Sequence, residues 1–201
     1  MSMSTTPRPD GYSGAAKWLH WIMAAIVIFV IPAGISLDKL PEGPLQDRMF
    51  NLHRSFGILV LALAIARVAI RRSRGTPAPY AGLTRFEQIA STAAHHTLYL
   101  LIFVTPLVGW AMMSAYRAEV PVFGLFNLPP ILPQSDATYK ILSGVHKFCG
   151  IVMALTLFAH AGGAFMHAFI KRDGVLHRML PNAWGPALDK VQSMLGKPNR
   201  S

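Results

Sequence analysis

ILSGVHKFCGIVMALTLFAHAGGAFMHAFI, residues 141–170, constrains the architecture of this chain more strongly than any other segment. It is apolar and longer than the roughly 20 residues that cross the hydrocarbon core of a bilayer. Two of its histidines, His146 and His160, are fourteen residues apart. On a helix their rings therefore leave the same face, about 21 Å apart along the axis. Because imidazole is costly in hydrocarbon unless something ligates or pairs it, this repeat predicts two stacked cofactors in one helical bundle.

The composition places the chain among membrane proteins. Of its 201 residues, 52% are hydrophobic and 14% are charged, whereas a soluble domain carries nearer a quarter charged residues. In a soluble protein the net charge of +10 would favour nucleic-acid binding. Here the basic residues gather at the ends of apolar runs, where they act as topology signals, so we expect no nucleic-acid partner.

Four apolar segments predict an all-α fold, a four-helix transmembrane bundle surrounded by membrane lipid. The expected spans are about residues 16–37, 53–70, 92–115 and 141–170. The first apolar run is too long for a secretory signal and lacks a clear small-residue cleavage site. We therefore expect the mature protein to retain it as its first span.

The rest of the chain is expected to form ends and loops. A polar arm at residues 1–14 and a basic, mostly polar tail at residues 172–201 would flank a four-helix domain at residues 15–171. The proline content of the 116–137 loop argues against a regular element there. Its apolar residues suggest that this loop lies at the membrane surface.

Basic residues predict the orientation of the bundle. The N-terminal arm, the 71–90 connector and the C-terminal tail, with their helix ends, carry thirteen Lys and Arg against four Asp and Glu. The other two loops and their helix ends carry six against five. Since positively charged segments stay in the cytoplasm, both termini are predicted to be cytoplasmic.

With this orientation, four histidines fall into two pairs of matched depth. The first span runs outward and the fourth runs inward, which puts His20 and His160 near the inner face. The second span also runs inward, which puts His53 at the outer face with His146. Each pair could supply two axial nitrogens to one haem iron, a six-coordinate centre suited to electron transfer. A lone histidine near a helix end is more often an interfacial polar residue, but four that pair by depth on three helices favour ligation.

The two haems are expected to be held without covalent bonds. Cys149 is the only cysteine, so the chain has neither an internal disulfide nor a C-x-x-C-H attachment motif. His95 and His96 have no depth-matched partner, and because they are adjacent only one of them can face the bundle interior. We interpret them as structural residues or as neighbours of a haem propionate, not as ligands.

Arg67 is a further candidate, since it lies fourteen residues after His53 and so on the same helix face at inner depth. An arginine at this position needs a counter-charge, which a haem propionate or a quinone carbonyl would provide. Snorkelling of the side chain to the headgroups explains its position equally well.

Three other residues are candidates at the two membrane surfaces. Arg54 and Lys147 directly follow the outer histidines and could attract small anions, although helix ends often carry such residues. His167 lies at the inner surface and could pass a proton to a reduced quinone. A solvated tail residue is the alternative interpretation of His167.

The chain resembles the bacterial cytochrome b561 family, the small four-helix di-haem membrane cytochromes. The resemblance is carried by YSGAAKWLHW, LHRSFGILVLALAIARVAIR, LYLLIFVTPLVGWAMMSA, and HKFCGIVMALTLFAH followed by FIKRDGVLHRMLP, within residues 12–181. The family's ligand positions fall on His20, His53, His146 and His160. The resemblance implies two haem b groups, a place in the bacterial inner membrane as a multi-pass protein, and electron exchange with ubiquinone.

Some members of the family resemble superoxide oxidases, which implies a specific activity. Superoxide would give up an electron at the outer face, beside Arg54 and Lys147, and a quinone would receive it. His167 and Arg67 are then the candidates for the quinone end.

Two other functions compete with this interpretation. A cytochrome b anchor subunit would pass electrons between a partner oxidoreductase and the quinone pool, and a partner chain would then copurify with it. A proton-coupled transporter would use its membrane histidines without haem, and its preparation would be colourless.

Overall fold

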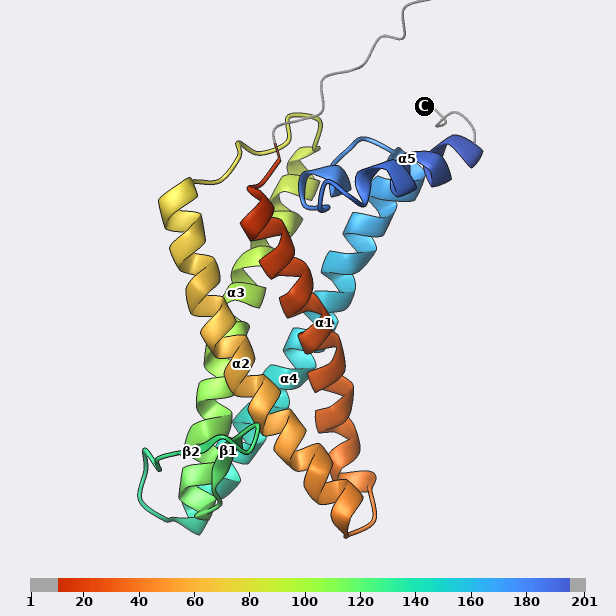
Figure 1. Cartoon of the computed structure of the whole chain (residues 1–201). Helices are drawn as coiled ribbons and strands as arrows, with labels where there is room; N and C mark the ends of the chain where they lie inside the picture. The colour runs from red at the N-terminus through yellow and green to blue at the C-terminus, as the bar shows by residue number, and fades with distance from the viewer. Residues whose placement is uncertain (1–10, 196–201) are drawn as a thin grey trace, which may run out of the picture.

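The computed structural model describes residues 11–195 of the chain. Within this part, four long helices run back and forth (Figure 1): α1 (Gly14–Ser36), α2 (Pro44–Arg74), α3 (Arg85–Tyr116) and α4 (Asp136–Phe165). By length and composition all four could cross a membrane. The predicted all-α transmembrane bundle is therefore confirmed.

The two ends of the described chain lie at the same end of the bundle (Figure 1). This terminal end holds the start of α1, the connection from α2 to α3, and the short helix α5 (Gly185–Met194). The opposite end, called the hairpin end below, holds the strands β1 (Val120–Val122) and β2 (Phe126–Leu128). The arrangement agrees with the expectation that both ends of the chain share one side, and the cytoplasmic location of that side stays a prediction.

The long helices begin earlier than the predicted spans, and side chains cap three of them, at Ser13, Thr84 and Ser135. The side chain of Thr84 accepts a hydrogen bond from the backbone N–H of Glu87, and the Glu87 carboxylate accepts one from the backbone of Thr84. This capping box starts α3 seven residues before the predicted span. The second helix, α2, has no side-chain cap and begins at Pro44, because proline in the first turn loses no helical hydrogen bond. Hydropathy predicts only the apolar part of each helix.

The loop at 116–137 was expected to be irregular, and this prediction is wrong. Residues Val120–Val122 and Phe126–Leu128 form an antiparallel hairpin in which Val122 lies opposite Phe126. The turn residues Phe123 and Gly124 have φ angles of 51° and 72°, the combination that a type I′ turn requires. Pro121 is compatible with β1 because a two-stranded sheet has free edges, where no N–H is needed.

The tail is more ordered than a polar tail suggests. The long fourth helix continues into a π-helical turn, η2 (Met166–Lys171), and is followed by the short helix η3 (Leu176–Arg178) and by α5. Trp184 lies just before α5, and its ring centre is 5.6 Å from that of Trp18 and 5.3 Å from that of Trp21. These contacts hold the tail against the start of α1. At the hairpin end, the short helix η1 (Leu37–Lys39) extends α1.

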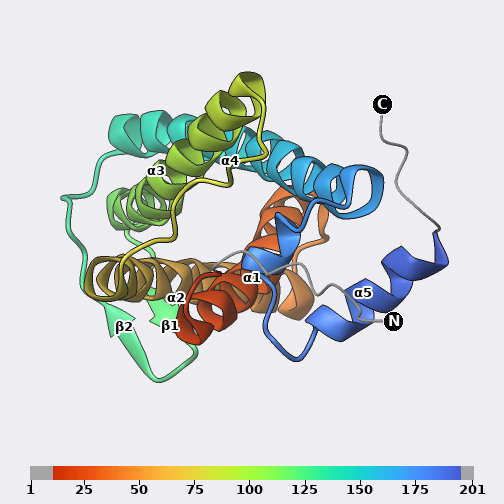
Figure 2. The ribbon, with the colours of Figure 1, turned by 90° about the horizontal axis from the view of Figure 1, so that it is seen from above.

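The packed centre of the bundle lies midway along the helices and draws two buried residues from each. Its members are Met23, Val27, Val60, Ala64, Leu101, Ile102, Cys149 and Met153. Seen along the bundle, α1 lies beside α2 and α3 lies beside α4 (Figure 2). Because lipid is as apolar as these side chains, they stabilise the bundle through van der Waals packing more than through transfer from water.

Candidate functional site

Two histidines face each other near the terminal end of the bundle. His20 lies in α1 and His160 in α4, and their ring centres are 6.2 Å apart with the ring planes at 77°. These two residues, called the terminal pair, belong to helices that make few direct backbone contacts with each other. The rings therefore approach across the boundary between the α1–α2 and α3–α4 hairpins.

A second pair lies near the hairpin end. His53 of α2 and His146 of α4 have ring centres 6.0 Å apart and ring planes at 79°. On α4 the two levels are fourteen residues apart, which corresponds to about 21 Å of helix. The packed centre of the bundle lies between this hairpin pair and the terminal pair.

The separation of the rings fits a haem iron with two axial histidines. A metal–imidazole bond is about 2.0 Å long, and the distance from the nitrogen to the ring centre adds about 1 Å. Two imidazoles on opposite sides of one metal ion therefore have ring centres roughly 6 Å apart. Both pairs have this separation. The chain thus offers two sites whose donors match the group, and ligation by these four histidines remains a prediction.

The rings of the hairpin pair are held by the main chain. Nδ1–H of His53 donates to the carbonyl of Val30, and Nδ1–H of His146 donates to the carbonyl of Thr105, both at 3.1 Å. Each bond fixes the tautomer and leaves Nε2 with a free lone pair, as an axial ligand needs.

Glycines make room for both rings of the hairpin pair. A Cβ at Gly34 would lie 2.7 Å from Cε1 of His53, and a Cβ at Gly109 would lie 3.0 Å from Cε1 of His146. In each case the glycine comes four residues after the residue whose carbonyl accepts the hydrogen bond. The ring therefore packs against the helix where the glycine has no side chain. The two sides of the site are built alike.

Two further glycines leave open space on the ligand side of the helices. Gly57 follows His53 by four residues and Gly150 follows His146 by four, so each shares the helix face of its histidine. A Cβ at either glycine would meet no atom within 4 Å. This open space lies one helical turn from the hairpin pair, where a flat macrocycle would need room.

His95 lies beside the terminal pair, although His96 does not. The ring centre of His95 is 5.1 Å from that of His160, with the planes at 68°. The ring of His96 turns back to its own helix, where Nδ1–H donates to the carbonyl of Thr92 at 2.8 Å. The expectation that one member of this doublet faces inward therefore agrees with the structure.

Arg67 reaches across the terminal end of the bundle. Its Nε donates to the hydroxyl of Tyr99 in α3 at 3.1 Å, and a terminal nitrogen donates to the carbonyl of Ala16 in α1 at 3.1 Å. Both partners are neutral, so among the described residues its charge is not matched by a carboxylate. The half-buried guanidinium links α2 to α1 and α3 at the terminal end, and its role stays a prediction.

The two candidate cations at the hairpin end differ in their surroundings. Arg54 donates to the carbonyl oxygens of Phe50 and Glu119 and to the side-chain oxygen of Asn51, all of them neutral. Lys147 instead forms an exposed ion pair with Asp38 at 3.0 Å. Asp47 acts on Arg54 electrostatically without forming an ion pair, so the charge of Arg54 is the more available of the two.

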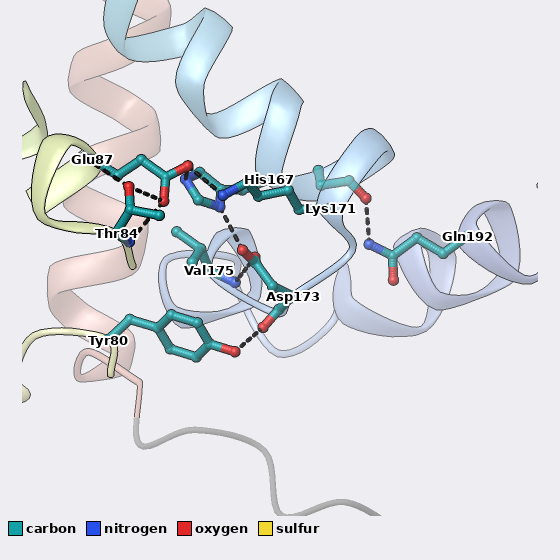
Figure 3. A network of polar contacts seen from close by, with 9 residues as sticks. Tyr80, Thr84, Glu87, His167, Lys171, Asp173, Val175 and Gln192 are labelled. Atoms are coloured by element: carbon teal, nitrogen blue, oxygen red, sulfur yellow. Dashed lines mark hydrogen bonds and ion pairs between the residues drawn. The ribbon is translucent and has the colours of Figure 1, made fainter. Parts of the chain in front are cut away.

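His167 is buried, with 7% of its surface exposed, which excludes the interpretation as a solvated tail residue. It lies in η2 between two carboxylates (Figure 3). Its Nδ1–H donates to Asp173 at 2.5 Å, and its Nε2 is 3.8 Å from Glu87, which also pairs with Lys171. Tyr80 fixes the chain at Asp173 through a hydrogen bond from its hydroxyl to the backbone carbonyl.

The sequence reasoning missed Glu87 and Asp173 as partners of His167. Glu87 had a local signal, because Thr84 and Glu87 have the spacing of a capping box. Asp173 had none, since its contact with His167 depends on the π-helical turn that precedes it.

The comparisons with known proteins agree with this geometry. A family model described as "Prokaryotic cytochrome b561" matches residues 11–182. "Cytochrome b561 homolog 2" of Escherichia coli (strain K12) is 29% identical over 182 residues, which cover 89% of this chain and 95% of the relative. "Probable superoxide oxidase CybB" of Yersinia pestis is 25% identical over 178 residues, covering 87% and 98%. "Cytochrome b562" of Cereibacter sphaeroides is 24% identical over 175 residues, covering 85% and 95%.

Proposed function

The chain belongs to the prokaryotic cytochrome b561 family of haem b-binding membrane electron-transfer proteins, and on this premise we propose that it is a superoxide:quinone oxidoreductase with two haem b groups. It resides in the bacterial inner membrane, takes electrons from superoxide at the hairpin end, and reduces ubiquinone at the cytoplasmic terminal end. One observation carries the proposal: two facing histidine pairs, with ring centres 6.2 Å and 6.0 Å apart, lie at opposite levels of one bundle.

His20 and His160 would hold the haem of the terminal end, and His53 and His146 that of the hairpin end. Bound haem supplies reversible one-electron chemistry of its iron. The chain orients the four imidazole rings that would hold the haems and, through the packed centre between the two levels, keeps water out of the bundle. Two levels about 21 Å apart extend across most of a hydrocarbon core about 30 Å thick.

The overall reaction balances with residues of this chain at each end. Two superoxide anions lose one electron each and become dioxygen, and ubiquinone gains these two electrons together with two protons. At the hairpin end Arg54 attracts the anion, since its guanidinium is bonded to neutral oxygens. Lys147 contributes less, because Asp38 offsets its charge. A relative named as a probable superoxide oxidase supports this substrate.

At the terminal end His167 donates a proton to the reduced quinone. Asp173 and Glu87 lie on either side of its ring and hold it in position. Arg67 presents its charge to a haem propionate or to a quinone carbonyl, since its protein partners are neutral.

The test measures superoxide-driven reduction of a ubiquinone analogue by purified protein in detergent, together with haem content per chain. We expect two haem b per chain, and the loss of one haem in His53→Ala and in His160→Ala. Two haems retained in either variant would contradict the ligand assignment. Copurification of a partner chain, with no superoxide turnover by the isolated protein, would favour the anchor-subunit alternative instead.

A further inference from the structure

The two histidine pairs differ in how their rings are held. Both rings of the hairpin pair donate Nδ1–H to a helix carbonyl, His53 to Val30 and His146 to Thr105. Within residues 11–195, neither His20 nor His160 has a hydrogen-bond partner. The terminal pair thus lacks the support that the hairpin pair receives from the main chain.

This difference matters because metal-bound histidines almost always donate their second ring N–H to a carboxylate, a carbonyl or another acceptor. Such a bond fixes the rotation of the ring and raises the basicity of the nitrogen that binds the metal. A ring without this partner would rotate more freely around its own side-chain bonds. A candidate acceptor must therefore lie within reach of the terminal pair.

His95 is the side chain in that position. Its ring centre lies 5.1 Å from that of His160, in helix α3, which packs more extensively on α4 than on any other element. Two imidazoles joined by an N–H···N hydrogen bond of about 2.9 Å have ring centres roughly 5 Å apart once the ring radii are added. The rings are in edge contact and share no hydrogen bond, so the bond requires a rotation of one ring.

A second contact orients His95 itself. Nδ1 of His95 is 3.3 Å from the hydroxyl oxygen of Ser91, one turn earlier in α3. If Nδ1 carries the proton and donates it to Ser91, then Nε2 of His95 is an acceptor. This is the tautomer that a donor on His160 would require.

We propose that His95 is the positioning residue of the terminal haem ligand His160, accepting a hydrogen bond from Nδ1–H of His160 at its own Nε2. The proposal rests on haem ligation by His160. Nε2 of His160 then remains available to bind iron. Ser91 orients His95 by accepting a hydrogen bond from its Nδ1–H. By making His160 a stronger donor, His95 stabilises the oxidised iron and lowers the midpoint potential of the terminal haem.

The neighbouring residue offers a matched control. His96 is on the same helix, one residue away, and its Nδ1–H is bonded to Thr92 of its own helix. His95→Ala removes the acceptor, His95→Gln retains one as an amide oxygen, and His96→Ala removes an imidazole that does not contact His160. An optical redox titration of each variant resolves two one-electron steps. His20→Ala identifies which step belongs to the terminal haem, because that step is lost or moves in this variant.

We expect His95→Ala to raise the midpoint of the terminal step by about 59 mV, which corresponds to a tenfold change in the one-electron equilibrium. The midpoint of the other step does not change. In His95→Gln the terminal midpoint returns most of the way to the value of the unmodified protein, and in His96→Ala it equals that value. Loss of the terminal haem in His95→Ala that His95→Gln restores also supports the role. An unchanged terminal step in His95→Ala with both haems bound, equal shifts of both steps, or a glutamine variant that behaves like alanine would overturn the proposal. Absence of haem from the unmodified protein would instead refute the proposed function.

Discussion

Gly34 of α1 lies so close to His53 of α2 that a Cβ on the glycine would be 2.7 Å from Cε1 of the ring. Real Cβ atoms do not approach other atoms so closely, so either the ring or the helix would have to move. The ring is also bonded to Val30, one turn earlier in the same helix. One glycine therefore permits both the helix contact and the ring position.

Gly34→Ala should displace the His53 ring and weaken or abolish haem binding at the hairpin end. The added methyl cannot be accommodated while Nδ1–H remains bonded to Val30. We expect haem content per chain to fall by up to one half, with the terminal haem retained, as measured by the reduced absorbance spectrum. Gly144→Ala is the control, because a Cβ there meets no atom within 4 Å. Full haem content in Gly34→Ala would show that the ring position is not needed for binding.

Arg54→Ala should slow the proposed reaction with superoxide more than Lys147→Ala does. The guanidinium of Arg54 has neutral partners, whereas the ammonium of Lys147 is paired with Asp38. Steering of a small anion by an available cation changes its association rate by on the order of tenfold at low ionic strength. Stopped-flow rates should converge for all three proteins as salt is added, because ions screen the attraction. Equal effects of the two substitutions would show that Asp38 does not offset Lys147.

Ser55→Ala should loosen the β-hairpin at the surface where superoxide is expected to enter. The hydroxyl of Ser55 donates to the carbonyl of Pro121 and accepts from the backbone N–H of Phe123, and the residue is 2% exposed. Its removal leaves the carbonyl of Pro121 and the N–H of Phe123 without this partner, at a cost of roughly 0.5–1.5 kcal/mol for each hydrogen bond. Faster hydrogen exchange at Phe123, without loss of haem, would be the expected result. An unchanged exchange rate would mean that the hairpin is held by its other contacts.

The histidine pairing is predictable from the sequence because two simple periodicities determine it. The length of each apolar segment fixes the depth of His20, His53, His146 and His160, and the helical repeat fixes which of them share a face. The carbonyl anchors of the hairpin pair are not predictable in this way. They depend on how α1 approaches α2 and how α3 approaches α4, which is a matter of packing between distant segments.

The hairpin and the carboxylate network escape prediction for the same reason. Pro121 argues against a strand by propensity, yet an edge of a two-stranded sheet tolerates it. Asp173 follows a basic run and looks solvated, but the π-helical turn of η2 and the left-handed conformation of Arg172 bring it under His167. Local sequence patterns contain no information on such long-range or strained geometry.

Substitution of His167 should separate the two halves of the proposed reaction. The ring is buried between Asp173 and Glu87 and lies in η2, beyond the end of α4 that is far from His146, so we expect its loss to affect the quinone end only. We expect His167→Asn to slow quinone reduction by about 10²-fold, the lower range for a lost general acid, while superoxide still reduces the haems at the original rate. His177→Gln is a suitable control, because it also breaks a histidine–carboxylate pair at the terminal end, with Asp189. If both variants, or neither, slow quinone turnover, His167 is not the proton donor, and the buried pair serves only to fix the turn that carries Asp173.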